Sequence, residues 1–368
     1  MALALYRKYR PSTFSDILGQ DLIVRILQEA VRQDKIAHAY LFSGPRGTGK
    51  TTTARLIAKV ANCLTRQKDA VFSKKGEPCN KCSVCQEISD GRNLNVIEID
   101  AASNRGIDEI RSLKENIRVS PSNTRYKVFI IDEVHMMTKD AFNALLKTLE
   151  EPPKYIILIL ATTEIEKIPV TILSRTQQFQ FKRVSLQQLI IKLRSIVKKE
   201  KMKISSEALE LIAAAAEGSF RDAESLLDQL TAGGDKDITI DEVEEMVGKI
   251  GFSALSEFSG YLLTSDIDKA LKHIAEVNDK GYNLVQFTKD VIQYLRRTAV
   301  LSFSPSMKKE FEKELINEHL KKLSDHAKLF TEKHLELLRA LITAYSQMRY
   351  SQFPIIPLEV AIIESLKD

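Results

Sequence analysis

The most informative stretch of the sequence is Gly44-Pro45-Arg46-Gly47-Thr48-Gly49-Lys50-Thr51, which matches the pattern G-x4-G-K-[ST]. It follows a short apolar run, 40–43, and opens a segment with apolar residues at helical spacing. In such a loop, backbone N–H groups surround phosphates, and the N-terminus of the following helix adds positive potential. Lys50 then reaches the β- and γ-phosphates, and Thr51 offers a hydroxyl to Mg²⁺. The motif predicts an ATP-binding α/β domain, and a glycine-rich turn that binds nothing is the alternative.

A pair of carboxylates follows a second apolar run. Asp132 and Glu133 come directly after 128–131, as the acidic partner of a P-loop does. We expect Asp132 to hold Mg²⁺ through water and Glu133 to orient and polarise the attacking water. A solvated acidic strand end is the alternative. A third apolar run ends in Thr162-Thr163, where a hydroxyl can lie between the carboxylates and the γ-phosphate.

The apolar pattern changes twice along the 368 residues. Short strand-like runs alternate with helical patterns over 1–179, which is typical of a parallel sheet flanked by helices. Apolar residues recur at spacings of three and four over 180–248, and amphipathic helices continue over 249–368. The sequence therefore predicts an α/β domain, a small helical domain and a second helical domain.

Composition narrows the class of protein. No apolar run approaches the roughly 18 residues of a membrane span, and the basic and apolar parts of the first 11 residues stand in the reverse order of a secretory signal. We expect a cytoplasmic protein. The formal net charge of +5 is a weak indication of an acidic partner such as nucleic acid, because 54 basic residues face 49 acidic ones.

All four cysteines fall within one short segment, at Cys63, Cys79, Cys82 and Cys85. Four thiolates in a reducing compartment can close a tetrahedral zinc site, and a site with four cysteine ligands is structural and not catalytic. Reduced thiols without a metal are the alternative, and a disulfide is less compatible with the expected compartment.

Four further stretches carry a resemblance to a known family: Tyr6-Arg7-Lys8-Tyr9-Arg10-Pro11, Asp132-Glu133-Val134-His135-Met136, Asn143-Ala144-Leu145-Leu146-Lys147-Thr148-Leu149-Glu150-Glu151-Pro152-Pro153 and Pro169-Val170-Thr171-Ile172-Leu173-Ser174-Arg175. The chain resembles the gamma/tau subunits of bacterial DNA polymerase III, which are clamp-loader AAA+ ATPases. The resemblance implies an α/β P-loop AAA+ motor domain with a zinc-binding insertion at about 63–90, a helical lid and an all-α collar that assembles the ring. It also implies that the chain ends with the collar, as a gamma-like product or a shortened tau form does.

The resemblance assigns roles to single residues as well. Thr163 becomes the first sensor, Arg221 the second sensor, and Arg175 the arginine finger that acts on ATP held by the adjacent subunit. Thr176 stands where the family has cysteine after Ser-Arg, and this change spares the arginine. Cys63 is separated from Cys79 by 15 residues, a wider gap than in the family pattern. The DNA-facing positions of the ring correspond to Arg105, Arg111 and Lys147.

The function implied is that of an ATPase within a DNA-directed DNA polymerase holoenzyme, which opens a sliding clamp and loads it onto primed DNA during replication. The implied partners are delta- and delta-prime-type subunits, copies of the chain, the clamp and primed DNA, without a membrane. A helicase-type remodelling motor is one alternative, although the sequence lacks an aromatic pore motif. A non-catalytic supporting subunit is the other, and intact Lys50, Thr51, Asp132 and Glu133 argue against it. His38 and His135 are interpreted as packing or hydrogen-bonding residues.

Overall fold

The computed structural model describes residues 3–103, 115–232, 237–247, 250–315 and 317–367. It divides into two compact units, which are Met1–Val184 with Gly218–Asp222, and Ser185–Glu217 with Ala223–Asp368. Each unit has a hydrophobic core of its own. Within the described ranges, no helix is both long enough and apolar enough to cross a membrane.

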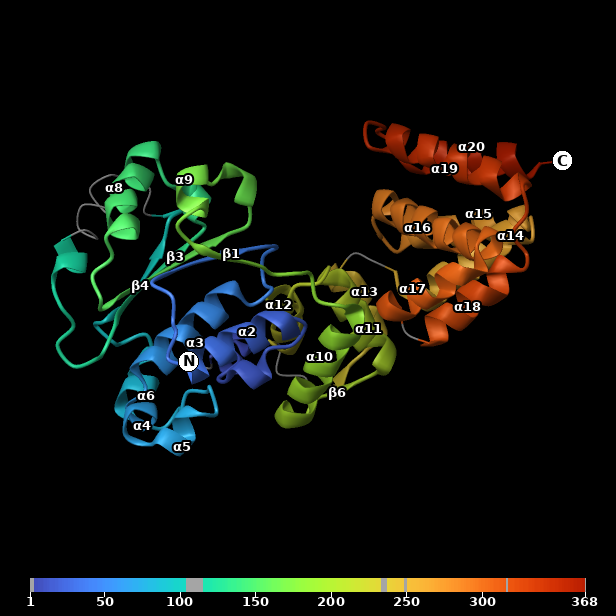
Figure 1. Ribbon diagram of the computed structural model, residues 1–368. Helices are drawn as coiled ribbons and strands as arrows, with labels where there is room; N and C mark the ends of the chain where they lie inside the picture. Colours follow the sequence, from blue (N-terminus) through green and yellow to red (C-terminus); the bar gives the residue numbers. More distant parts are fainter. Residues whose placement is uncertain (1–2, 104–114, 233–236, 248–249, 316, 368) are drawn as a thin grey trace. The chain divides into compact units, whose positions relative to one another are not determined.

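The first unit is built on a five-stranded parallel sheet (Figure 1). In their order across the sheet, the strands are β2 (Val96–Asp100), β3 (Lys127–Asp132), β4 (Ile156–Thr162), β1 (Ala39–Ser43) and β5 (Gln177–Gln180). The three interior strands, β3, β4 and β1, are almost wholly buried. Parallel strands covered by helices on both faces are expected to be apolar throughout, and this explains their continuous apolar runs in the sequence.

Helices cover both faces of this sheet (Figure 1). On one face, α2 (Asp21–Arg32), α3 (Lys50–Asn62) and α6 (Ser83–Ser89) pack against strand residues that include Tyr40 and Phe42. On the other face, α8 (Lys139–Glu150) packs against residues that include Leu41 and Phe129. The shorter elements of this unit are α1 (Leu5–Lys8), η1 (Phe14–Asp16), α4 (Leu64–Lys68), α5 (Ala70–Ser73), η2 (Val134–Met136), η3 (Ile165–Lys167) and α9 (Val170–Leu173).

Several predicted site residues lie at the carboxyl ends of the interior strands. Ser43, the last residue of β1, pairs with Thr162, the last residue of β4, and β3 ends beside them at Asp132. The loops that leave these strands therefore begin at one edge of the sheet. Ligands of open α/β sheets bind at this edge.

The second unit is mainly helical. Ser185 and Ser205 cap the N-termini of its first two helices, and the Ser185 cap is a capping box with Gln188. The helices are α10 (Leu186–Glu200), α11 (Ser206–Ala215), α12 (Phe220–Thr231, which begins in the first unit), α13 (Ile240–Val247), α14 (Phe252–Leu263), α15 (Ile267–Asp279), α16 (Leu284–Phe303), η4 (Pro305–Met307), α17 (Lys308–Glu314), α18 (Asn317–Ala327), α19 (Lys333–Met348) and α20 (Ile355–Leu366).

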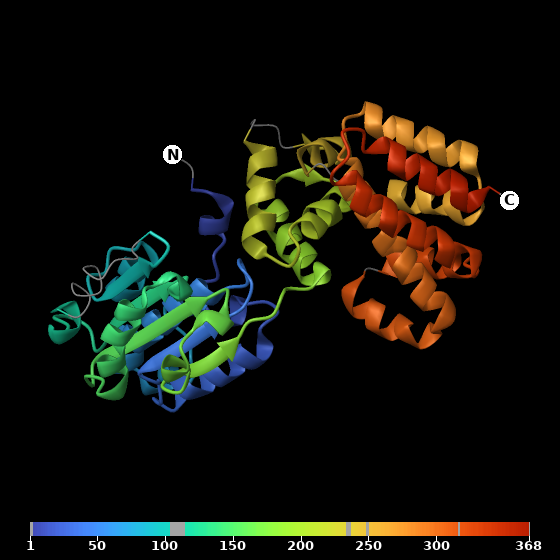
Figure 2. The same ribbon diagram turned by 90° about the horizontal axis from the view of Figure 1, so that it is seen from above.

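Two features of this unit stand out beside the predicted helices. β6 (Lys203–Ile204) and β7 (Asp237–Ile238) form a parallel pair, which the sequence did not predict because two-residue strands leave no periodicity. The last helices, α19 and α20, lie side by side in both views, and α16 packs against α14, α18 and α19 (Figures 1 and 2). The core among α14–α16, α19 and α20 is apolar.

Candidate functional site

The P-loop depends on glycine at three positions. Gly44, Gly47 and Gly49 have φ values of 136°, 72° and 103°, in the left-handed region that favours glycine. A Cβ atom at Gly44 would lie 2.3 Å from the carbonyl oxygen of Phe181, and one at Gly47 would lie 1.9 Å from Ser219 Oγ. The loop is thus closely covered by 181 and 219, and only glycine fits at these two points.

Lys50 is a buried cation inside this loop. Its side chain is 6% exposed, and its Nζ donates hydrogen bonds to the carbonyl oxygens of Gly44 (2.7 Å) and Pro45 (2.9 Å). Burial lowers the pKa of Lys50, and the carboxylates of Glu133 and Asp132 act in the opposite direction. An ammonium group in this position is available to an anion that enters the loop.

A pair of oxygen groups suited to Mg²⁺ lies beside the lysine. Thr51 Oγ1 donates a hydrogen bond of 2.6 Å to Asp132 Oδ2, although the two residues are 81 positions apart. Hydroxyl and carboxylate oxygens are the hard ligands that Mg²⁺ prefers. The contact confirms that the P-loop helix and the end of β3 meet, as the motif spacing predicted.

Glu133 adopts an unusual backbone conformation. Its φ of 48° and ψ of 44° place a non-glycine residue in the left-handed region, a feature that costs about 1–3 kcal/mol and occurs often at functional sites. The conformation brings Glu133 Oε2 to 2.9 Å from the Oγ1 and 3.3 Å from the backbone N of Thr163, which both donate to it. The structure therefore joins the predicted water-orienting residue to the predicted first sensor.

His135 is part of the same group of contacts. Its Nδ1 lies 3.0 Å from Thr162 Oγ1 and 3.4 Å from Glu133 Oε2, and its Nε2 lies 3.1 Å from Glu164 Oε1. The sequence interpretation of a hydrogen-bonding histidine fits these contacts. The sequence did not indicate that Glu133 is one of the partners of His135, because that contact depends on the turn at 133–136.

Arg221 lies beside the P-loop, although it is more than 170 positions away in sequence. The backbone N of Phe220 donates a hydrogen bond of 3.1 Å to the Gly47 carbonyl oxygen, and residues 218–222 belong to the first unit. The Arg221 guanidinium stands 5.2 Å from the centre of the Tyr6 ring. A cation held near the mouth of the loop can approach phosphate oxygens.

Arg175 occupies a different part of the first unit. Its guanidinium contacts Glu150 Oε1 (2.9 Å), the Thr171 carbonyl oxygen (3.0 Å) and Ser174 Oγ (3.0 Å). It lines an open hollow of about 720 Å³ together with His38, Leu149, Glu150, Ser174 and Thr176. The predicted arginine finger is therefore grouped with the end of α8 and with α9, and the structure does not bring it to the P-loop of its own chain.

The four cysteine sulfurs form one cluster. All four Sγ atoms lie within 4.8 Å of one another, and those of Cys79 and Cys85 are 4.0 Å apart. A tetrahedral zinc site with Zn–S bonds of 2.3 Å places its sulfurs about 3.8 Å apart. The hydrogen bond with Cys85 lowers the pKa of the Cys63 thiol to about 4 and raises that of Cys85, so the pair shares a proton. A bound cation would favour the thiolate form of all four groups, and the donor set fits zinc.

Cys63 joins the cluster despite its wide spacing because the intervening segment is anchored. Cys63 follows the last residue of α3 directly. The buried Arg66 guanidinium donates hydrogen bonds to the carbonyl oxygens of Val60 and Val31 and to Ser73 Oγ. The basic insertion therefore folds back on α2 and α3, and the residues after it return to Cys63.

The predicted DNA-facing residues are only partly described. Arg105 and Arg111 lie outside the described residues. Lys147 is exposed on α8, while Leu145 and Leu149 of the same helix are buried, as the sequence predicted.

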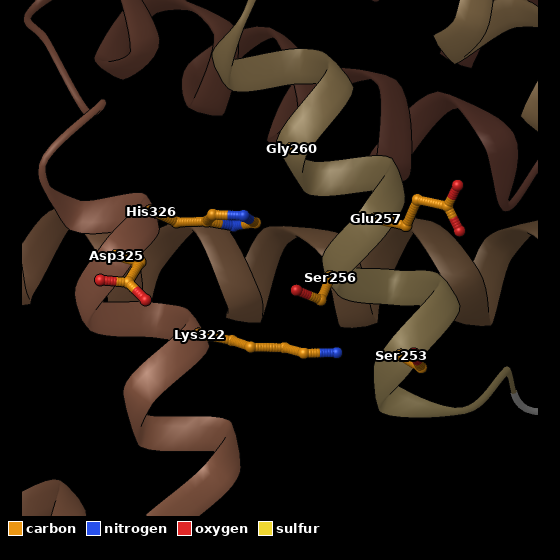
Figure 3. A pocket seen from close by; sticks show the side chains of 7 residues that line it. All are labelled: Ser253, Ser256, Glu257, Gly260, Lys322, Asp325 and His326. Atoms are coloured by element: carbon orange, nitrogen blue, oxygen red, sulfur yellow. The ribbon is translucent and has the colours of Figure 1, made fainter.

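A second hollow, of about 410 Å³, lies wholly within the helical unit (Figure 3). The side chains of Lys322 and His326 reach from α18 toward α14, and the Tyr294 hydroxyl lies 3.0 Å from Ser256 Oγ and 2.9 Å from His326 Nδ1. Its lining residues are Ser253, Ser256, Glu257, Gly260, Lys322, Asp325 and His326. Acidic and basic groups are mixed here, and the lining includes none of the predicted site residues.

The parallel sheet, the phosphate-binding loop and the Thr51–Asp132 pair define a P-loop nucleotide-binding protein. Three family descriptions match successive parts of the chain: DNA polymerase III, delta subunit, at 19–185; DNA polymerase III clamp loader subunit, ATPase lid domain, at 188–236; and DNA polymerase III subunits gamma and tau domain III at 238–367.

Curated relatives give the family directly. DNA polymerase III subunit gamma of Buchnera aphidicola subsp. Schizaphis graminum is 40% identical over 303 residues, which are 82% of this chain and 82% of that protein. DNA polymerase III subunit tau of Bacillus subtilis is 40% identical over 361 residues, which are 98% of this chain and 62% of that protein. The chain belongs to the gamma/tau subunit family of DNA polymerase III. Its fold class is thus a P-loop AAA+ domain followed by a lid and a helical third domain, as expected.

The chain spans only 45% of the gamma/tau subunit of Mycoplasma pneumoniae and 62% of the Bacillus subtilis protein. Among solved structures, the Thermotoga maritima RuvB Holliday junction branch migration motor has a TM-score of 0.46 and 19% identity, covering 64% of this chain and 71% of that chain.

Proposed function

We propose that the chain is the ATP-driven motor subunit of a clamp loader, which binds and hydrolyses ATP to open a sliding clamp and load it onto primed DNA. The observation that carries this proposal is the grouping of Lys50, the Thr51–Asp132 pair and the Glu133–Thr163 pair at one edge of the sheet, in a chain of the gamma/tau family. A non-catalytic relative has no need of all these groups together.

ATP binding uses the P-loop as follows. The backbone N–H groups of 44 and 46–50 would surround the phosphates, and Lys50 Nζ would exchange the Gly44 and Pro45 carbonyls for β- and γ-phosphate oxygens. Thr51 and Asp132 would hold Mg²⁺, which neutralises charge on the phosphates when bound.

Hydrolysis needs a positioned water. Glu133 accepts the proton or orients the water, and its strained backbone fixes the direction of the carboxylate. Thr163 now donates to Glu133, and a γ-phosphate gives its hydroxyl a second acceptor. The Thr163–Glu133 hydrogen bond can therefore differ between the states with and without a bound γ-phosphate. Arg221, next to Gly47, supplies positive charge from the 218–222 segment of the first unit.

The proposed partners follow from Arg175. Its place beside Glu150 and Thr171 suits an arginine that completes the ATP site of an adjacent subunit, where it stabilises charge in the transition state. ATP at such boundaries favours one ring conformation, and hydrolysis removes the contacts that favour it. We include delta- and delta-prime-type subunits, copies of the chain, the clamp and primed DNA in this proposal, with Lys147 on the DNA-facing surface.

Three finer predictions belong to the same proposal. Zinc is held by the four cysteines as a structural ion. The chain divides into a motor domain at 1–179, a lid at 180–248 and a collar at 249–368. The protein works in the cytoplasm, where replication takes place.

Two variants test the nucleotide site. Lys50→Ala removes the cation from the phosphates and should weaken ATP binding, whereas Glu133→Gln should bind ATP and hydrolyse it slowly. Glu164→Gln is the matched control, because its carboxylate contacts the opposite nitrogen of His135, and its rate should stay near that of the wild type. Hydrolysis by Glu133→Gln at the wild-type rate would show that the water-orienting assignment is wrong.

A further inference from the structure

The carboxylate of Glu77, in the cysteine-rich insertion, gathers donors from the N-terminal part of the chain. Its Oε2 accepts a hydrogen bond from the backbone N of Phe14 (2.7 Å). Its Oε1 accepts from the backbone N and Oγ of Ser15 (2.9 and 2.8 Å) and from Gln28 Nε2 (2.7 Å). Asp16 caps the turn at η1 from within, and the Glu77 carboxylate attaches this turn to the insertion through charge-assisted hydrogen bonds, which are stronger than neutral ones.

The loop that carries Glu77 also carries two of the cysteines. Asn80 has a φ of 55°, donates from Nδ2 to the Ser12 carbonyl oxygen (2.9 Å) and accepts at Oδ1 from Lys59 Nζ (3.2 Å). The neighbouring Cys79 Sγ accepts from the backbone N atoms of Lys81 (3.4 Å) and Cys82 (3.3 Å). One loop therefore forms part of the cysteine cluster and makes hydrogen bonds to both ends of the segment 12–15.

The segment 12–15 is connected to the nucleotide site through Tyr6. Tyr6, in the helix before it, places its ring 5.2 Å from the Arg221 guanidinium. Arg221 follows Phe220, whose backbone N bonds to Gly47 of the P-loop. All of these residues belong to the first unit. Contacts at residues 12–15 and at Tyr6, joined by the chain through residues 7–11, thus connect the insertion with the cation beside the P-loop.

We propose that Glu77 is a positioning residue for the nucleotide site: it holds the N-terminal segment so that Tyr6 keeps the Arg221 guanidinium at the P-loop. This inference rests on the proposed ATP binding. The cysteine insertion then has a definite task in the motor, which is to order the N-terminal segment. Without Glu77, the amide groups of Phe14 and Ser15 lose their acceptor, the segment loosens, and Arg221 loses the ring that orients it.

The test compares Glu77→Ala with Glu87→Ala in the full chain. Glu87 is a matched control because it lies in the same insertion and accepts a hydrogen bond from Asn93 Nδ2 (2.8 Å), outside the N-terminal segment. We expect Glu77→Ala to bind a fluorescent ATP analogue about three- to tenfold more weakly, the scale of one lost cation–π contact. Its metal content should match the wild type, hydrogen exchange at the amides of Phe14 and Ser15 should be faster, and Glu77→Gln, which keeps a carbonyl acceptor, should bind with intermediate affinity.

The Tyr6→Leu variant distinguishes an effect of Glu77 through Tyr6 from a general loss of structure. In Tyr6→Leu, the further change Glu77→Ala should leave ATP affinity unchanged, because the contact through which it acts is already absent. The same loss in both backgrounds, or a Glu77→Ala affinity equal to that of Glu87→Ala, would overturn the inference while the proposed function stands. A wild-type chain that binds no ATP would overturn both.

Discussion

A methyl group at Gly47 tests the contact between the P-loop and the segment that carries Arg221. The added Cβ would lie 1.9 Å from Ser219 Oγ, 2.9 Å from Ser219 Cβ and 3.3 Å from Arg221 Cβ, at a backbone φ of 72°. The left-handed conformation costs alanine about 1–2 kcal/mol, and overpacking costs about 1–3 kcal/mol more. Gly47→Ala should therefore lower the free energy of unfolding of the first unit by about 2–5 kcal/mol.

Gly91→Ala separates these two contributions. Gly91 has a φ of 70°, and an added Cβ there meets nothing within 4 Å, so this variant carries the backbone cost alone. Urea unfolding of the nucleotide-free chain, followed by circular dichroism, should show a larger loss for Gly47→Ala by about 1–3 kcal/mol. The double variant Gly47→Ala/Ser219→Gly should recover most of this difference, since it removes the clashing atoms. Equal losses for the two alanine variants, or no recovery by Ser219→Gly, would show that contact with Ser219 does not destabilise Gly47→Ala.

Three more predictions concern other parts of the chain. Burial raises the pKa of Glu224 to about 7 despite Lys192 at 3.7 Å, so ionisation of this carboxyl group destabilises the folded state as pH rises from 4.5 to above 7. Glu224→Gln should therefore raise the free energy of unfolding by up to about 3 kcal/mol at pH 8 and by little at pH 4.5. Equal effects in urea titrations at both pH values would contradict this prediction. Protein purified without added zinc should carry about one equivalent by metal analysis. A fully stable metal-free chain would argue against zinc, and the metal should be lost when serine replaces Cys79, Cys82 and Cys85. Lys147→Ala should weaken primed-DNA binding by the assembled loader about equally across sequences and reduce the salt slope by about 1, whereas an unchanged slope would place the DNA surface elsewhere.

The sequence predicted the parts of the site that local patterns encode. The P-loop is a contiguous strand, loop and helix, and Asp132 and Glu133 end a strand of apolar residues, so both could be found without a structure. The Thr51–Asp132 contact then follows from the order of parallel strands. Three members of the cysteine cluster were also predictable, because Cys79, Cys82 and Cys85 lie close together in sequence, whereas the place of Cys63 depends on how the insertion folds back.

Contacts between distant segments could not be predicted in the same way. Nothing in the sequence near Glu77 indicates that its partners are Phe14 and Ser15, because the turn at η1 and the loop after α5 meet only in the folded unit. The fit of Ser219 against Gly47 also depends on where the 218–222 segment returns to the first unit. The left-handed backbone of Glu133 has no local sequence signal either, since turn chemistry usually favours glycine or asparagine there.

We propose that ATP hydrolysis by this chain drives clamp loading, and the hydrolysis rate of the chain assembled with delta- and delta-prime-type subunits tests this proposal. The rate should rise when a sliding clamp and primed DNA are added together, and Glu133→Gln should abolish the rise while the complex still binds ATP. A rate that clamp and primed DNA leave unchanged, or that unrelated proteins raise equally, would show that hydrolysis is not coupled to clamp loading.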